Sequence, residues 1–78
     1  MLRPQHTAKS RLQEYLQARK KPLPVYEVVD IQGDAPNQHF KVECLVQGLP
    51  VKYGEGSSRR FAEQSVAADI LKLLEIKS

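Results

Sequence analysis

The chain has 78 residues, with 12 Lys and Arg against nine Asp and Glu, for a formal net charge of +3. This length is far below the roughly 250 residues at which chains divide into domains, so we expect one domain with one small core. Hydrophobic residues make up 41% and charged residues 27% of the chain, which is typical of a folded globular protein and excludes a disordered or collagen-like one. The small excess of cations suits an anionic partner without requiring one.

Membrane and disulfide-linked classes are also excluded by the sequence. No apolar run approaches the roughly 20 residues that cross a bilayer, and residues 1–6 lack the apolar stretch of a secretory signal, so we expect a cytoplasmic protein without membrane contact. The single cysteine, Cys44, rules out an intrachain disulfide and a zinc site built on a Cys pair, and we expect it to be a small buried core residue. Residues 1–6 are predicted to form a flexible linker before a module over residues 7–76.

A first helix is predicted over residues 8–20. Thr7 can serve as its N-cap, and Pro22 and Pro24 prevent it from continuing. One face of this helix follows a period of 3.6 residues and contains Ala8, Leu12, Tyr15, Leu16 and Arg19. A polar stripe on the opposite face contains Ser10, Gln13, Glu14 and Gln17.

Three strands are predicted next. The run 25–31 is rich in β-branched and aromatic residues, and turn formers occupy 33–38. Residues 40–46 alternate between apolar and mostly polar side chains, which predicts a strand with one buried face. A third strand is predicted over 51–53, and the sequence Gly-Glu-Gly at 54–56 is expected to end it.

A second helix is predicted from Ser58 to near the end of the chain, because a capping hydroxyl precedes a long alanine-rich segment. The element order is therefore α-β-β-β-α. We expect an α+β domain in which the two helices cover one face of a three-stranded antiparallel sheet.

Two arginines, Arg59 and Arg60, occupy the first turn of this second helix. Cations there oppose the helix dipole, at a cost of about 0.3–1 kcal/mol each, so stability alone does not favour them. An anion bound at the helix start would reverse the sign, because free backbone N–H groups, the Ser58 hydroxyl and two guanidinium groups would converge on it. From this feature alone, a phosphate site and a solvated pair of charges are equally good interpretations.

The combination of three polar elements favours a nucleic acid. These elements are the polar stripe of the first helix, the 33–39 loop and the basic start of the second helix. Glu14 would be repelled by phosphates but can accept a hydrogen bond from a ribose 2′-hydroxyl, which DNA lacks. The spacing of the three polar elements suits two successive minor grooves of A-form RNA and the phosphates between them. The predicted RNA-binding residues are Ser10, Gln13, Glu14, Gln17, Pro36, Asn37, His39, Ser58, Arg59 and Arg60.

The same residues resemble a known family, the double-stranded RNA-binding domain. The resemblance runs through nearly the whole chain. It is carried by Tyr26 after a proline, Gly33 seven positions before Phe40, Val46-x-Gly48, Gly54-x-Gly56-x-Ser58-Arg59-Arg60-x-Ala62 and Ala67-Ala68. Within the family, the segments 11–17 and 57–64 look most like the C-terminal domain of bacterial ribonuclease III.

This resemblance implies that the chain is the RNA-binding part of a larger nuclease. The parent enzyme would cleave double-stranded RNA with Mg²⁺ in a separate domain, would act as a homodimer, and would process ribosomal and other precursor transcripts. The acidic nuclease signature of that domain is not in this chain. We therefore expect a monomeric binding module that has no catalytic residues, metal, cofactor or small-molecule ligand of its own and does not cleave RNA.

Two positions depart from the family pattern. Pro36 stands where the family loop commonly has a histidine, with His39 nearby, and Glu63 stands at the last basic position of the second helix, which is expected to weaken the cation cluster. These departures keep an alternative open, in which the same fold is a protein-interaction module with weak or no RNA binding.

Overall fold

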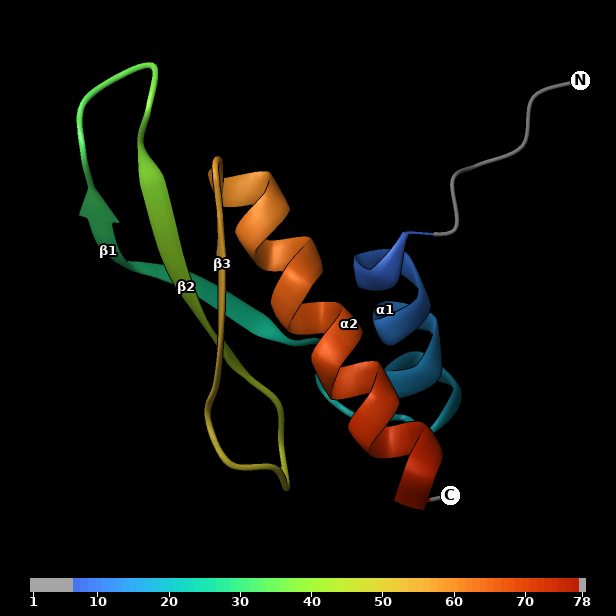
Figure 1. Cartoon of the computed structure of the whole chain (residues 1–78). Helices are drawn as coiled ribbons and strands as arrows, with labels where there is room; N and C mark the ends of the chain where they lie inside the picture. The colour runs from blue at the N-terminus through green and yellow to red at the C-terminus, as the bar shows by residue number, and fades with distance from the viewer. Residues whose placement is uncertain (1–6, 78) are drawn as a thin grey trace, which may run out of the picture.

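The computed structural model describes residues 7–77, with side chains up to residue 75. The elements are α1 (Ala8–Ala18), β1 (Val25–Gln32), β2 (His39–Leu45), β3 (Lys52–Gly56) and α2 (Arg59–Lys77). The strands form an antiparallel sheet in the order β1-β2-β3, and both helices lie on one side of it (Figure 1). The predicted α+β architecture is confirmed. The linker predicted over residues 1–6 lies outside the described residues.

The ends of α1 follow from local hydrogen bonds. At its start, the Thr7 side chain accepts a hydrogen bond from the backbone N–H of Ser10, as the predicted N-cap should. The helix ends at Ala18, two residues earlier than predicted, because Lys20 adopts a left-handed conformation with φ 58°. The N–H groups of Lys20 and Lys21 then donate back to carbonyls of the last turn, at 3.0 and 2.9 Å.

The core lies between the helices and the sheet. Leu12 and Leu16 of α1 are fully buried and pack against the apolar face of α2 and the inner side of β2. Cys44 is buried as predicted, and this burial raises the pKa of its thiol to about 11, so it is protonated and unreactive at neutral pH. The core cluster is completed by Val46, Val66, Ala67, Ile70 and Leu71.

The prediction that residues 54–56 end the third strand is wrong, because they form its second half. Gly54 pairs with Val42 of β2 and lies directly under α2. A Cβ atom added to Gly54 would lie 2.5 Å from the carbonyl oxygen of Ala62 and 2.6 Å from the nitrogen of Val66. Glycine at this position therefore lets helix and strand approach closely.

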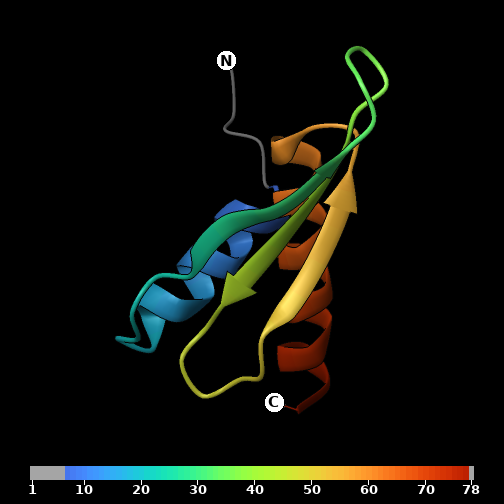
Figure 2. The same cartoon turned by 90° about the vertical axis from the view of Figure 1, so that its left-hand side faces the viewer.

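The sheet face turned away from the helices carries charged side chains beside the exposed apolar pair of Val25 and Leu45. Cross-strand pairing places Glu27 beside Glu43 and Asp30 beside Lys41, and the Lys41 ammonium lies 5.0 Å from the centre of the Tyr53 ring. Figure 2 views the sheet from this side. We call this surface the open sheet face, and its charged and aromatic residues include Glu27, Asp30, Lys41, Glu43, Tyr53 and Glu55.

Candidate nucleic-acid interface

The three polar elements predicted from the sequence lie toward the same end of the molecule. The start of α1, the 33–38 loop between β1 and β2, and the start of α2 are all found there in both views (Figures 1 and 2). Segments far apart in the sequence are thus brought to one side of the domain. A single extended ligand can contact them together.

The polar stripe of α1 is mostly available to a ligand. Gln13, Glu14 and Gln17 are exposed. Ser10 is half-buried, and its hydroxyl oxygen accepts a hydrogen bond from the Thr7 hydroxyl at 3.1 Å. The stripe therefore offers two amides and a carboxylate to solvent, with Ser10 committed in part to capping the helix.

The start of α2 is capped by Ser58 and presents free N–H groups. The Ser58 hydroxyl accepts from the N–H of Phe61 at 3.1 Å, and the Ser58 carbonyl accepts from the N–H of Ala62 at 3.0 Å. Ser58 is thus the predicted capping residue. Within the described part of the chain, the N–H groups of Arg59 and Arg60 have no acceptor. These donors lie at the positive end of a 19-residue helix, where an anion is favoured.

The two arginines of this first turn are not equivalent. The Nε of Arg59 donates to Oε2 of Glu63 at 2.8 Å, although 58% of the Arg59 side chain is exposed. Arg60 has no carboxylate partner among residues 7–75. Arg60 is therefore the unpaired cation of the predicted site, whereas Arg59 forms an ion pair with Glu63.

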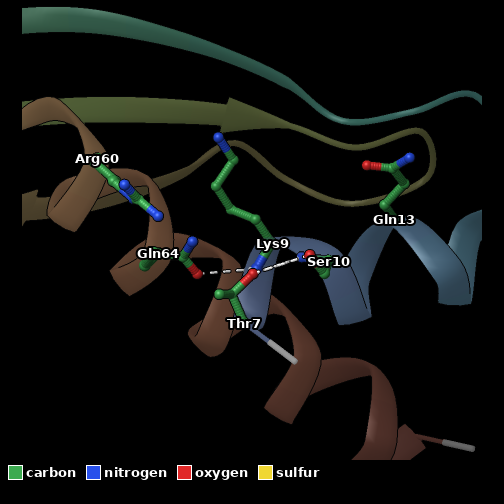
Figure 3. A pocket seen from close by; sticks show the side chains of 6 residues that line it. All are labelled: Thr7, Lys9, Ser10, Gln13, Arg60 and Gln64. Atoms are coloured by element: carbon green, nitrogen blue, oxygen red, sulfur yellow. Dashed lines mark hydrogen bonds between the residues drawn. The ribbon is translucent and has the colours of Figure 1, made fainter. Parts of the chain in front are cut away.

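An open pocket of about 550 Å³ joins the starts of the two helices. Figure 3 shows the polar side chains around it, with Arg60 and Gln64 on α2 facing residues of α1. This pocket connects Ser10 and Gln13 of the polar stripe to Arg60 at the start of α2. Its lining residues are Thr7, Lys9, Ser10, Gln13, Arg60 and Gln64.

Lys9 and Glu63 are functional candidates that sequence reasoning missed. Glu63 was expected only to weaken the cation cluster, but just 7% of it is exposed, and its Oε1 lies 2.5 Å from the Lys9 ammonium. The spacing of Arg59 and Glu63 in one helix was a visible signal for their pairing. The Lys9 contact joins residues 54 positions apart, so no local pattern reveals it.

The ionisation of Glu63 is set by two opposing effects. Burial raises the pKa of its carboxyl, but the hydrogen bonds and charges of Lys9 and Arg59 outweigh burial and hold the pKa below its ordinary value of 4.5. Glu63 is therefore ionised at neutral pH. One anion between two cations leaves a net charge of +1 in this group, beside the further charge of Arg60.

The loop residues divide into two groups. Pro36 and Asn37 are exposed, and the N–H of Asn37 donates to the carbonyl of Asp34 at 2.7 Å. His39 instead begins β2, and its Nε2 lies 2.6 Å from Oε1 of Glu55 on the open sheet face. Pro36 and Asn37 are thus accessible on the loop, whereas His39 is engaged on the sheet.

Neither a membrane span nor a metal centre is found in the described residues. None of their helices combines the length and apolar character needed to cross a bilayer. No group of three or more His, Cys, Asp or Glu side chains among them could hold a metal ion. What the interface offers a ligand is hydrogen-bond donors, acceptors and cations.

Comparison with known proteins gives consistent matches. The chain is 88% identical over 67 residues to Ribonuclease 3 of Acinetobacter pittii, covering 86% of this chain and 29% of that protein. It is 55% identical over 74 residues to Ribonuclease 3 of Glaesserella parasuis, covering 94% and 33%. The chain therefore spans about a third of the length of these relatives.

Structural and family comparisons agree with the sequence matches. A solved structure of the first dsRBD of the protein HYL1 superposes with a TM-score of 0.72 at 39% identity, covering 90% of this chain and 99% of that one. The expected resemblance to the double-stranded RNA-binding domain and to ribonuclease III is confirmed. The family model described as "Double-stranded RNA binding motif" matches residues 8–74, and the chain belongs to that family.

Proposed function

We propose that the chain recognises the shape of an RNA duplex through the surface formed by α1, the pocket and the start of α2. The observation that carries this proposal is the pocket between the helices, because it joins the exposed stripe to the unpaired cation Arg60. A domain of this family spans about 16 base pairs and contacts two minor grooves and the phosphates between them.

Each part of the surface has a distinct role in this proposal. Gln13, Glu14 and Gln17 enter a minor groove, where Glu14 accepts a hydrogen bond from a ribose 2′-hydroxyl. Arg60 and the free N–H groups at the start of α2 bind phosphates of the neighbouring major groove. Pro36 and Asn37 reach the second minor groove. RNA is thus distinguished from DNA on α1, and most of the salt-dependent affinity comes from α2.

The biological context is part of the same proposal. We infer that this chain positions duplex RNA, including ribosomal and other precursor transcripts, for cleavage by a cytoplasmic ribonuclease III. The cleaving activity, its Mg²⁺ and the dimer interface belong to the remaining two thirds of such a protein. The chain itself is a monomer without catalytic activity, and Mg²⁺-dependent cleavage by the purified chain would contradict this.

A titration tests the binding proposal. The chain is mixed with an RNA duplex of about 20 base pairs, which exceeds the expected site, and separately with single-stranded RNA and duplex DNA. Each titration is run at two salt concentrations. We expect duplex RNA to bind most tightly and its affinity to fall steeply with salt. Equal affinity for all three ligands would overturn the proposal.

A protein-interaction module is the second candidate. It is favoured by two ion pairs that engage predicted RNA-binding residues with the protein's own carboxylates, Arg59 with Glu63 and His39 with Glu55. If these pairs dominate, no duplex binds even at low salt. The same titration therefore separates the two functions.

A further inference from the structure

Lys9 is fixed to both α2 and the sheet. Besides its ion pair with Glu63, its backbone N–H donates to Oε1 of Gln64 at 3.0 Å. Its ammonium also lies over the Tyr26 ring of β1, 5.0 Å from the ring centre. Two adjacent residues of α2 thus hold the first turn of α1: Glu63 contacts the Lys9 side chain, and Gln64 accepts from the Lys9 backbone N–H.

Glu63 divides its two oxygens between the helices. Oε1 binds Lys9 of α1 and Oε2 binds Arg59 at the start of α2, while the Glu63 side chain is only 10% exposed. Arg59 uses its Nε in this contact, which is one of five N–H donors on a guanidinium group. The remaining donors of Arg59 stay on the exposed end of the side chain, where a phosphate can reach them.

We propose that Glu63 is a positioning residue for duplex RNA. It orients the Arg59 guanidinium and holds the start of α1 at a fixed place beside the start of α2. The polar stripe and the start of α2 are then already at the right separation for a duplex of fixed dimensions. Because no side chains need to be ordered on binding, the affinity is higher. This inference rests on the proposed function, since it requires both surfaces to contact one RNA duplex.

Charge alone predicts the opposite effect of Glu63. A carboxylate beside a phosphate site repels the ligand, so its removal raises the local positive charge and should strengthen binding to a polyanion. Under the positioning role, removal of the charge frees Arg59 and Lys9 and weakens binding. The sign of the change in affinity therefore separates the two explanations.

The variant E63Q tests this in the full 78-residue chain. Affinity for an RNA duplex of about 20 base pairs is measured by fluorescence anisotropy. We expect E63Q to bind about five- to tenfold more weakly, which is the size of coupling found within a shared ion-pair network.

The matched control is E75Q. It removes the same charge and an ion pair between the same two helices, Arg11 with Glu75 at 3.0 Å, toward the other end of α2. Both of these side chains are about half exposed, at 53% and 54%. We expect E75Q to bind RNA as tightly as the unaltered chain or slightly more tightly.

A second background separates positioning from general stability. In a chain that already carries K9Q and R59Q, adding E63Q should cause no further loss of affinity, because the two cations that Glu63 positions are absent. A structural role unrelated to these cations would persist there. Thermal melts establish that each variant is folded at the temperature of the binding experiment, and if E63Q is not, all variants are compared at a lower temperature at which it is folded.

The outcomes are distinct. The proposal is supported if E63Q weakens binding in the otherwise unaltered chain and causes no further loss of affinity in the K9Q and R59Q background. Unchanged or tighter binding by folded E63Q overturns it, as does an equal loss in both backgrounds. If the unaltered chain does not bind duplex RNA, the proposed function fails and this inference fails with it.

Discussion

The two faces of the sheet differ in packing and in charge. One face is covered by the helices, whose starts bring together Lys9, Arg59 and Arg60. The open sheet face carries four carboxylates against one lysine. We therefore expect a polyanion to be attracted to the covered side of the domain and repelled from the open sheet face. The net charge of +3 does not show this difference, because it is a sum over the whole chain and says nothing of where the charges lie.

The largest expected effect is a loss of stability caused by disrupting the packing of the covered face. In Gly54→Ala the new Cβ would collide with the backbone of α2, so the free energy of unfolding should fall by about 3 kcal/mol. Urea denaturation followed by circular dichroism measures this change.

The neighbouring residue on the open sheet face is the control. Tyr53 is 51% exposed, and Tyr53→Ala should cost about 1 kcal/mol or less, because an exposed side chain has little packing to lose. Equal losses in the two variants would show that the faces are not packed as described.

The second prediction concerns the unpaired cation. Arg60→Ala should weaken duplex RNA binding about tenfold, the size of one charge-assisted hydrogen bond. It should also reduce the slope of log affinity against log salt by about 1. Lys41→Ala removes the same charge from the open sheet face and should leave affinity nearly unchanged. A Lys41 effect as large as that of Arg60 would place RNA on the wrong side of the molecule.

The third prediction sharpens the role of the polar stripe. Glu14→Ala should narrow the preference for duplex RNA over duplex DNA by about three- to tenfold, because one acceptor for a ribose 2′-hydroxyl is lost. The ratio of the two dissociation constants measures it. Glu43→Ala, on the open sheet face, should leave that ratio unaltered. Equal losses for RNA and DNA with Glu14→Ala would remove the 2′-hydroxyl contact from the account.

The smallest expected effect is a pH dependence of stability. The folded pKa of Glu63 lies below its ordinary value, so its ion pairs contribute stability that is fully present above pH 4.5 and is lost as the pH falls through the lower folded value. The difference in free energy of unfolding between the unaltered chain and E63Q should therefore be constant near neutral pH and shrink as the pH falls below 4.5. A difference that does not change with pH would show that the carboxylate is not stabilised by its partners.

The fold was largely predictable because its signals are local. The helical period of α1, the alternation along β2 and the Ser58 cap each specify an element without reference to the rest of the chain. The third strand was misjudged because Gly54 is a turn former by local preference. Glycine is needed at this position because α2 approaches the strand closely. This is a tertiary contact, which a short segment of sequence does not reveal.

The candidate site was predictable in part for the same reason. The Arg59 and Arg60 pair, the stripe of α1 and the loop are visible as composition and spacing. The difference between the two arginines is not, because it depends on Glu63 being buried. The contact of Lys9 with Glu63 needs the folded helix pair to exist, so sequence patterns could not supply it.

Mapping of amide chemical shifts in the labelled chain tests the central claim most directly. On addition of an RNA duplex of about 20 base pairs, the shifts should change at Gln13, Gln17, Arg60 and the 33–38 loop, with little change along β1 and β3. Changes centred instead on the strands of the open sheet face, with the starts of the helices unaffected, would contradict the account.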